Sequence, residues 1–376
     1  MKPIQMVDLV GQYNKIKDEV EAAQRRVMET AAFINGPEVK EFEKELGAYL
    51  GVQHTIGCAN GTDALQIAMM ALGLKAGDEV ITASFTFVAT VEVVALLGIT
   101  PVFADVQPGT FNLDPEDIKR KITPRTKAIV PVHLFGQTAD MEPIMAIAKE
   151  HGLYVIEDNC QAVGSDYTFS NVTTKKAGTI GHVGTTSFFP SKNLGCYGDG
   201  GALFTNDDEL AKRIRRVCNH GSDVRYYHEV IGVNSRLDSL QAAVLRIKLR
   251  HLDAYAAARN AAASTYDKAF AGIPGLTTPE RSPNSTHVFH QYTLKVAGGK
   301  REALRKHLEE RGIPAMIYYP VPCHLQNAYK TARFAEGSLP VTESITHEVL
   351  SLPMSTELDN EQLGYITGAV KSFFNQ

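Results

Sequence analysis

The sequence predicts an α/β fold in which a large domain with a mostly parallel central sheet is followed by a smaller α+β domain. Three observations favour this fold. Short apolar runs alternate with helical patterns between about 38 and 220, as in a parallel sheet with both faces covered by helices. The chain has 376 residues, more than one small core accounts for, so a second domain is expected. A long helical pattern that starts near 236 then leads away from the first domain.

The elements of the large domain follow one another in a regular order. Residues 37–51 have the apolar spacing of an amphipathic helix, and in 62–74 the apolar residues share one helical face. Further helices are expected near 86–97, 114–121 and 140–151. Strands are expected at 54–59, 78–83, 100–106, 127–136 and 153–159.

The pattern changes in the second half of the chain. Residues 163–186 are rich in Thr, Gly and Ser and are expected to form short antiparallel strands. After the long helical region, a strand is expected at 290–296 and a helix at 299–312. The expected domains are 1–255, large, and 256–376, small.

The composition is that of an ordinary globular protein, with 44% hydrophobic and 21% charged residues. A formal net charge of -4 favours neither nucleic acid nor a membrane as partner. The amino-terminal MKPIQMVDLV lacks the apolar stretch of a signal peptide, and the five cysteines form no close pair, so reduced thiols in the cytoplasm are expected. The scattered histidines form no metal-ligand cluster, so no metal is expected.

The stretch SFFPSKNLGCYGDGG, residues 187–201, gives Lys192 an unusual setting. Phe188, Phe189 and Pro190 look like the end of a buried segment, where a lysine must be desolvated or paired. The glycines that follow allow tight turns and close approach of the backbone. A lysine in apolar surroundings loses its proton more easily and can attack a carbonyl as an amine.

The stretch CANGTDAL, residues 58–65, marks the end of a strand and the start of a helix. Gly61 turns the chain, and the free N–H groups that follow form an anion site to which Thr62 can add a hydroxyl. Asn, Thr and Asp are also good capping residues, so a plain helix cap is the alternative. Ser187 poses the same choice between a phosphate ligand and an ordinary strand serine.

Two further strands end in side chains that can serve a cofactor. YVIEDNCQ contains Glu157 and Asp158, and a carboxylate there can hold a protonated ring nitrogen or merely cap the next turn. ASFTFVAT contains Phe85 and Phe87, which can stack on a planar cofactor or belong to the core. An anion-binding helix start, a stacking aromatic, a strand-end carboxylate and a desolvated lysine together match the needs of pyridoxal phosphate.

These residues resemble the sugar aminotransferases of the DegT family, which have the fold-type-I aspartate-aminotransferase architecture. The resemblance covers nearly the whole chain. It is densest in CANGTDALQIA, GDEVITASFTFVAT, VIEDNCQAVG, SFFPSKNLGCYGDGGALFTND and VNSRLDSLQAA. The resemblance implies pyridoxal 5'-phosphate as cofactor and L-glutamate as amino donor, which leaves as 2-oxoglutarate.

The resemblance also implies roles for individual residues. Lys192 is expected to form the Schiff base, Asp158 to pair with the pyridine nitrogen, and Phe87 to stack on the ring. Lys192 and Asp158 are thus the expected catalytic residues. Gln161 is expected near the phenolic oxygen of the cofactor. The expected phosphate ligands are Gly61, Thr62 and Ser187.

A second group of residues concerns the neighbouring subunit and the substrate. Asn234 is expected to reach the phosphate of the neighbouring subunit, which implies a homodimer with shared active sites. Arg236 is expected to face a sugar carboxylate, with an interface salt bridge as the alternative. The chain reads YYP where relatives often read HYP, so Tyr319 is expected to replace a nucleotide-contacting histidine, and His324 follows the broader family pattern. The insertion 168–178 lengthens a hairpin near the site.

Within the family, the resemblance is strongest to enzymes that aminate C3 of UDP-2-acetamido-2-deoxy-3-oxo-glucuronate, a reaction of surface polysaccharide and O-antigen biosynthesis. A C3 or C4 aminotransferase for another UDP- or dTDP-sugar is the alternative. Three rivals are disfavoured. A dehydratase of the same family would carry histidine at Lys192, a regulatory relative without turnover would not need the intact cofactor residues, and a nicotinamide oxidoreductase would show GxGxxG after its first strand.

Overall fold

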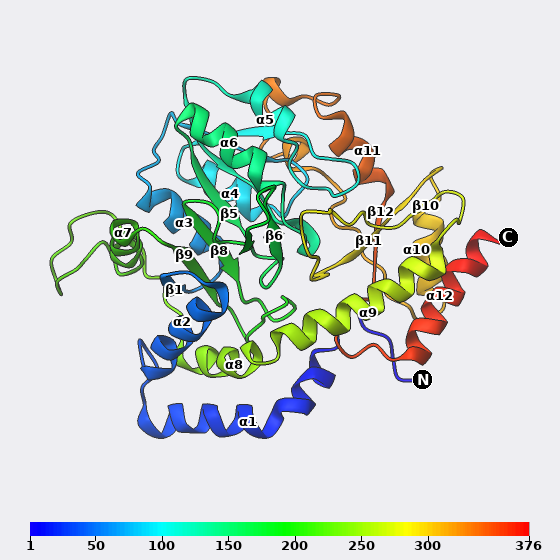
Figure 1. The fold of residues 1–376 in the computed structure, drawn as a ribbon, viewed down its shortest axis with the longest axis horizontal. Helices are drawn as coiled ribbons and strands as arrows, with labels where there is room; N and C mark the ends of the chain where they lie inside the picture. The colour runs from blue at the N-terminus through cyan, green and yellow to red at the C-terminus, as the bar shows by residue number, and fades with distance from the viewer. Residues whose placement is uncertain (376) are drawn as a thin grey trace.

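A seven-stranded, mostly parallel sheet forms the centre of the computed structural model, which describes residues 1–375 (Figure 1). The strands lie in the order β1-β9-β8-β5-β4-β2-β3. Neighbours from β8 to β3 run parallel, whereas β9 is antiparallel to both β1 and β8. The bounds are β1 His54–Cys58, β2 Glu79–Ala83, β3 Thr100–Ala104, β4 Thr126–Val130, β5 Tyr154–Asp158, β8 Val183–Ser187 and β9 Gly201–Thr205.

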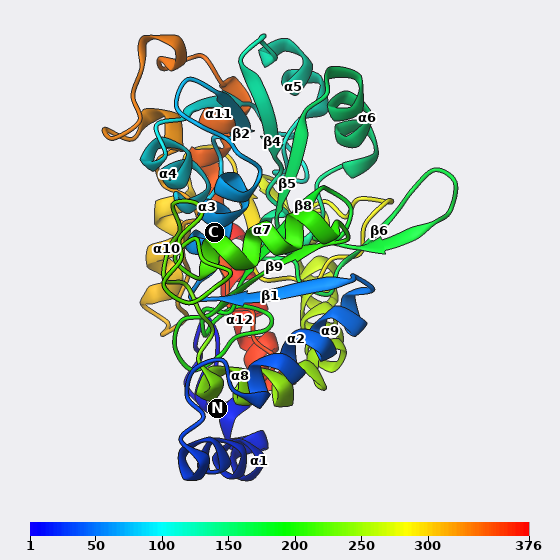
Figure 2. The same ribbon diagram turned by 90° about the vertical axis from the view of Figure 1, so that its left-hand side faces the viewer.

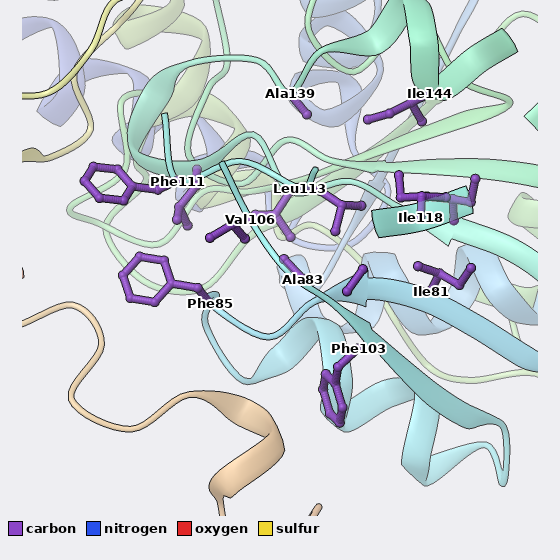
Figure 3. Close-up of a cluster of buried hydrophobic side chains, with 14 of the residues drawn as sticks. Ile81, Ala83, Phe85, Phe103, Val106, Phe111, Leu113, Ile118, Ala139 and Ile144 are labelled. Atoms are coloured by element: carbon purple, nitrogen blue, oxygen red, sulfur yellow. The ribbon is translucent and has the colours of Figure 1, made fainter. Parts of the chain in front are cut away.

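Helices cover both faces of this sheet, because successive residues of a strand point to opposite sides. Val80 packs in a cluster with α3, α4 and α7, while its neighbour Ile81 packs with α5 and α6. Figure 3 shows the second cluster, in which Ile81 lies near Ile118 and Ile144. The bounds are α3 Gly61–Ala71, α4 Ala89–Leu96, α5 Pro115–Lys121, α6 Met141–His151 and α7 Asp208–Cys218.

The β1–β9 side of the sheet is covered by α2 (Pro37–Leu50) and α8 (Ser239–Leu249), which share a core with Phe188 and Phe204. α1 (Leu9–Thr30) packs on the outer side of α8 and forms the lower edge of the molecule in both ribbon views (Figures 1 and 2). The loop that contains Lys192 packs against α2 and α8 through Phe188 and Leu194 on either side of the lysine.

The smaller unit is built on an antiparallel sheet in the order β10-β11-β12. Its core contains Tyr266, Tyr292 and Leu294, and Ile4 from the amino-terminal segment joins it. Within residues 1–375, no helix combines the length and apolar character needed to cross a membrane. The bounds are α9 Leu252–Phe270, β10 Leu276–Thr277, β11 Tyr292–Val296, α10 Arg301–Glu309, α11 Pro340–Glu348, β12 Val349–Leu352 and α12 Asn360–Phe374.

The structure differs from the expected elements at three places. The helical region from 236 is two helices, α8 and α9, rather than one. The strand expected at 127–136 ends at Val130, after which the chain leaves the sheet. Between 163 and 186 only a short hairpin is separate, since β8 joins the central sheet. The hairpin and the short 3-10 helices are β6 Asp166–Thr168, β7 Thr174–Lys176, η1 Leu134–Gly136, η2 Cys323–Leu325 and η3 Ala332–Phe334.

Candidate active site

A cavity of about 780 Å³ opens where β5 and β8 end and α3 begins. Parallel strands deliver their carboxyl ends to the same edge of a sheet, which is where open α/β folds bind ligands. Eleven residues were singled out from the sequence, and most of them meet here. Those that line the cavity are Gly61, Thr62, Phe87, Asp158, Gln161, Ser187, Lys192 and Tyr319.

Asp158 is the last residue of β5, and its buried side chain lines the cavity. One carboxylate oxygen accepts a hydrogen bond from Thr90 Oγ1 at 2.7 Å, and the other accepts one from the backbone N–H of Cys160 at 3.2 Å. Glu157 lies outside the lining, where its carboxylate accepts backbone N–H groups within 178–181. Of the two acids, Asp158 is therefore the one that can meet a ligand. Thr90, which orients it, carried no signal in the sequence.

The amino terminus of α3 borders the same space. Asn60 caps the helix by accepting the backbone N–H of Asp63 at 2.8 Å, and the first turn contributes Gly61 and Thr62 to the lining. A Cβ on Gly61 would lie 2.6 Å from Cβ of Ser187, so only glycine lets the helix approach the end of β8 this closely. Cap and anion site are thus compatible: the side chain of Asn60 does the capping, and the helix end still faces the cavity.

Lys192 lies on the loop that joins β8 to β9, in a tight turn closed by its N–H donating to the Phe189 carbonyl at 2.8 Å. Its amine reaches the cavity wall. Burial lowers the pKa of Lys192 below its ordinary value, although Cys160 and Asp158 act in the opposite direction. Desolvation therefore favours the neutral, nucleophilic amine.

Gln161 and Tyr319 form a polar pair on the wall. Gln161 accepts the backbone N–H of Phe135 at 2.8 Å and donates through Nε2 to the Tyr319 hydroxyl at 3.2 Å. Phe87 is 55% exposed at the rim, and its ring centroid is 6.4 Å from that of Tyr319. Phe85, the other aromatic of that stretch, is buried in the core. Phe87 is thus the aromatic available for stacking.

Three of the residues singled out lie elsewhere. His324 is buried, with Nδ1 2.6 Å from Ser84 Oγ and Nε2 3.2 Å from Glu343, and it is not part of the lining. Asn234 is exposed on the segment after α7, and Arg236 lines a separate hollow near β1. None of the residues 168–178 lines the cavity, and in Figure 2 the β6 hairpin projects away from the body. Across residues 1–375, no group of three or more His, Cys, Asp or Glu could hold a metal ion.

The geometry fits pyridoxal 5'-phosphate. The helix end beside Gly61 is shaped for a phosphate, and any larger residue would fill that cradle. The amine of Lys192 has no hydrogen-bond partner among the described residues, so it is free to form a Schiff base. The carboxylate of Asp158 lines the same space. Fold and site together define a pyridoxal-phosphate-dependent enzyme of fold type I.

The chain belongs to the DegT/DnrJ/EryC1/StrS aminotransferase family, whose profile matches residues 14–371. It is 46% identical over 367 residues to the UDP-2-acetamido-2-deoxy-3-oxo-D-glucuronate aminotransferase of Pseudomonas aeruginosa, covering 98% of this chain and 99% of that one. It is 47% identical over 373 residues to a protein of Geobacillus stearothermophilus named pleiotropic regulatory protein, covering 99% and 98% of the two chains.

Solved structures agree with this assignment. S. venezuelae DesV, crystallised in complex with a ketimine intermediate, matches with a TM-score of 0.95 at 42% identity and covers 100% of both chains. The predicted family, fold class and cofactor are thereby confirmed. The protein is a pyridoxal-phosphate-dependent sugar aminotransferase, and its substrates are nucleotide sugars.

Proposed function

We propose that the protein transfers the amino group of L-glutamate to the C3 carbonyl of a UDP-sugar of the UDP-2-acetamido-2-deoxy-3-oxo-glucuronate type. The product is a 3-amino nucleotide sugar for surface polysaccharide or O-antigen. The observation that carries the proposal is the unpaired amine of Lys192 in one cavity with the carboxylate of Asp158. The similarity to the Pseudomonas enzyme over nearly the full chain supports the identity of the sugar.

The proposed chemistry divides between the two residues. Pyridoxal 5'-phosphate, when bound, supplies a carbonyl for amines and an electron sink. Asp158, held by Thr90, keeps a proton on the ring nitrogen. Lys192 Nζ accepts the proton that leaves Cα of glutamate, and in the second half-reaction it delivers a proton to C3 of the sugar. Gln161 and Tyr319 offer neutral hydrogen bonds beside it.

The charges of the cavity support a homodimer with shared sites. Of the described residues that line it, Asp63, Asp158 and Asp199 are acidic, and Lys192 and His290 are basic. Burial and neighbouring cations hold the pKa of His290 well below its ordinary value, so this histidine adds no positive charge at pH 7. A nucleotide sugar carries a diphosphate, so further cations must come from elsewhere. The segment 219–236 projects beside α7 in Figure 1 and exposes both apolar side chains and polar ones such as Asn234. A second copy of the chain, in the cytoplasm, is the proposed partner of this segment.

Two other functions are weaker candidates. The first is a regulatory protein without turnover, since the Geobacillus relative is named a pleiotropic regulatory protein. The geometry of Lys192 and Asp158 argues against this, because a binding protein has no need of an unpaired, desolvated amine. Another 3-oxo or 4-oxo UDP- or dTDP-sugar is the second alternative, and the residues that would choose among sugars, such as Arg236 and Tyr319, are predicted by resemblance.

The visible absorption spectrum tests the proposed function. The protein with pyridoxal 5'-phosphate is expected to show a Schiff-base band that bleaches on addition of L-glutamate. Lys192→Ala is expected to lack that band. A band that L-glutamate does not change would show that the cofactor is bound but that L-glutamate is not the amino donor.

Lys248 provides a matched control. It is 2% exposed, and burial lowers its pKa to about 8, but it does not line the cavity. Borohydride reduction followed by peptide mapping is expected to find the cofactor on Lys192 and none on Lys248. Equal labelling of the two lysines would show that a lowered pKa alone, rather than the cavity, selects the site.

A further inference from the structure

His290 is a buried histidine in the cavity wall, and the proposed transamination assigns it no role. Its side chain is 5% exposed and lines the cavity together with Lys192. Nδ1 is sealed from solvent and has no hydrogen-bond partner among the described residues. Nε2 is neither sealed nor bonded to those residues, so it is the ring nitrogen that a molecule in the cavity can reach.

The backbone around His290 is fixed from several sides. The guanidinium of Arg259, which is buried, donates to the carbonyls of Phe289 and His290 at 3.0 and 3.4 Å. Asn193 Nδ2 donates to the Val288 carbonyl at 2.9 Å, which ties the segment to the residue after Lys192. The imidazole therefore has a defined position relative to the reactive amine. A polar ring held in such a place without a partner is costly, and a ligand that bonds to Nε2 would lower that cost.

The electrostatics determine which kind of hydrogen bond the ring offers. Burial, Lys192 and Arg259 hold the pKa of His290 well below its ordinary value, so the ring is neutral at pH 7. A neutral imidazole has one N–H donor and one acceptor. If the proton is on Nε2, the sealed Nδ1 has only an unpaired lone pair, which costs less than an unpaired N–H donor. The tautomer with the proton on Nε2 is therefore favoured.

The amino donor has a matching need. L-glutamate carries two carboxylates, and the amine of Lys192 is occupied by the cofactor when the donor enters. The remaining charged side chains of the lining, Asp63, Asp158 and Asp199, repel carboxylates. Within one copy of the chain, the lining groups left to hold a donor carboxylate are neutral hydrogen-bond donors, and His290 Nε2 is one with no other partner among the described residues.

We propose that His290 Nε2–H donates a hydrogen bond to a carboxylate of the dicarboxylic amino donor, which makes His290 a specificity-determining residue of the first half-reaction. The inference rests on the proposed function, because that function supplies the dicarboxylic donor. Nothing in HVFHQY distinguished this histidine from its neighbour His287, whose ring stacks on Phe289 outside the cavity.

Binding of glutarate, an unreactive dicarboxylate of the same chain length, tests the proposal by calorimetry on the cofactor-loaded protein. His290→Phe is expected to weaken glutarate binding about 10- to 100-fold, as loss of a hydrogen bond to a charged group does. His290→Gln, which restores an N–H donor, is expected to recover most of the affinity. The matched control is His307→Gln, on α10 and bonded to α12 away from the cavity.

Steady-state kinetics add a second readout. His290→Phe is expected to raise the KM for glutamate by a similar factor, while the KM for the nucleotide sugar and kcat stay within a few-fold. Wild-type affinity for glutarate in His290→Phe would overturn the proposal, as would a rise confined to the sugar KM. Glutarate binding could depend on His290 while L-glutamate fails to aminate the cofactor. That result would refute the proposed function but would support the carboxylate contact of His290.

Nitrogen NMR keeps the proposal testable if His290→Phe does not fold. In ¹⁵N-labelled wild-type protein, glutarate is expected to shift the imidazole Nε2 resonance that is missing in His290→Gln. An unchanged resonance at saturating glutarate would overturn the proposal.

Discussion

The contact between Gly61 and the end of β8 gives the sharpest structural prediction. In Gly61→Ala the new Cβ would meet Cβ of Ser187 at 2.6 Å and Sγ of Cys160 at 3.0 Å. Ordinary carbon contacts are about 3.5–4.0 Å, so α3 and β8 must separate by about 1 Å. Overpacking of this kind costs about 1–3 kcal/mol. It also displaces the helix end that is expected to hold the cofactor phosphate.

Two measurements check this prediction. Thermal unfolding of the cofactor-free protein is expected to show a lower Tm for Gly61→Ala, and absorption titration is expected to show pyridoxal phosphate binding weakened about 10-fold or more, since a shift of about 1 Å in a positioned group is costly. Gly364→Ala is the control, because nothing lies within 4 Å of the Cβ it adds on α12. Unchanged Tm and cofactor affinity in Gly61→Ala would refute the argument that this position requires glycine.

Two further predictions concern buried histidines. Burial lowers the pKa of His287 to about 3 from 6.5, so between these values the unfolded chain binds a proton that the folded chain does not. His287 should therefore lower the free energy of unfolding by about 1.4 kcal/mol for each pH unit below 6.5. Denaturant titrations at several pH values should show that the free energy of unfolding of His287→Gln depends less steeply on pH than that of the wild type, and an equal pH dependence would contradict this assignment. Ser84→Ala leaves Nδ1 of His324 without its partner and is expected to cost about 1–3 kcal/mol of stability while the KM for the nucleotide sugar stays within a few-fold; a tenfold rise in that KM would instead favour substrate contact through His324.

Strand ends and helix starts made the centre of the site predictable. Asp158 ends an apolar strand, and Gly61 follows another. Because parallel strands end at the same edge of a sheet, the sequence alone predicts that these two residues lie close together, and both line the cavity. The alternation of side chains along β5 then separates Asp158 from Glu157, a distinction that the dipeptide alone does not make. Local pattern and chain topology were sufficient for these residues.

Other features depend on packing between distant segments, which a local pattern does not record. Thr90 reaches Asp158 across 68 positions, and Ser84 reaches His324 across 240. The break between α8 and α9 at Arg250 and His251 contains neither glycine nor proline, so the sequence shows one continuous helical pattern there. Both hydrogen bonds and the helix break depend on contacts between segments far apart in the sequence, so the local sequence pattern does not predict them.

Transfer of labelled nitrogen tests the central claim most directly. The protein, loaded with pyridoxal 5'-phosphate, is incubated with ¹⁵N-labelled L-glutamate and UDP-2-acetamido-2-deoxy-3-oxo-glucuronate, and the product is examined by NMR. The account predicts ¹⁵N bonded to C3 of the sugar with wild-type protein and none with Lys192→Ala. Transfer that persists in Lys192→Ala would contradict the role of this lysine, and an unaminated sugar with wild-type protein would contradict the proposed reaction.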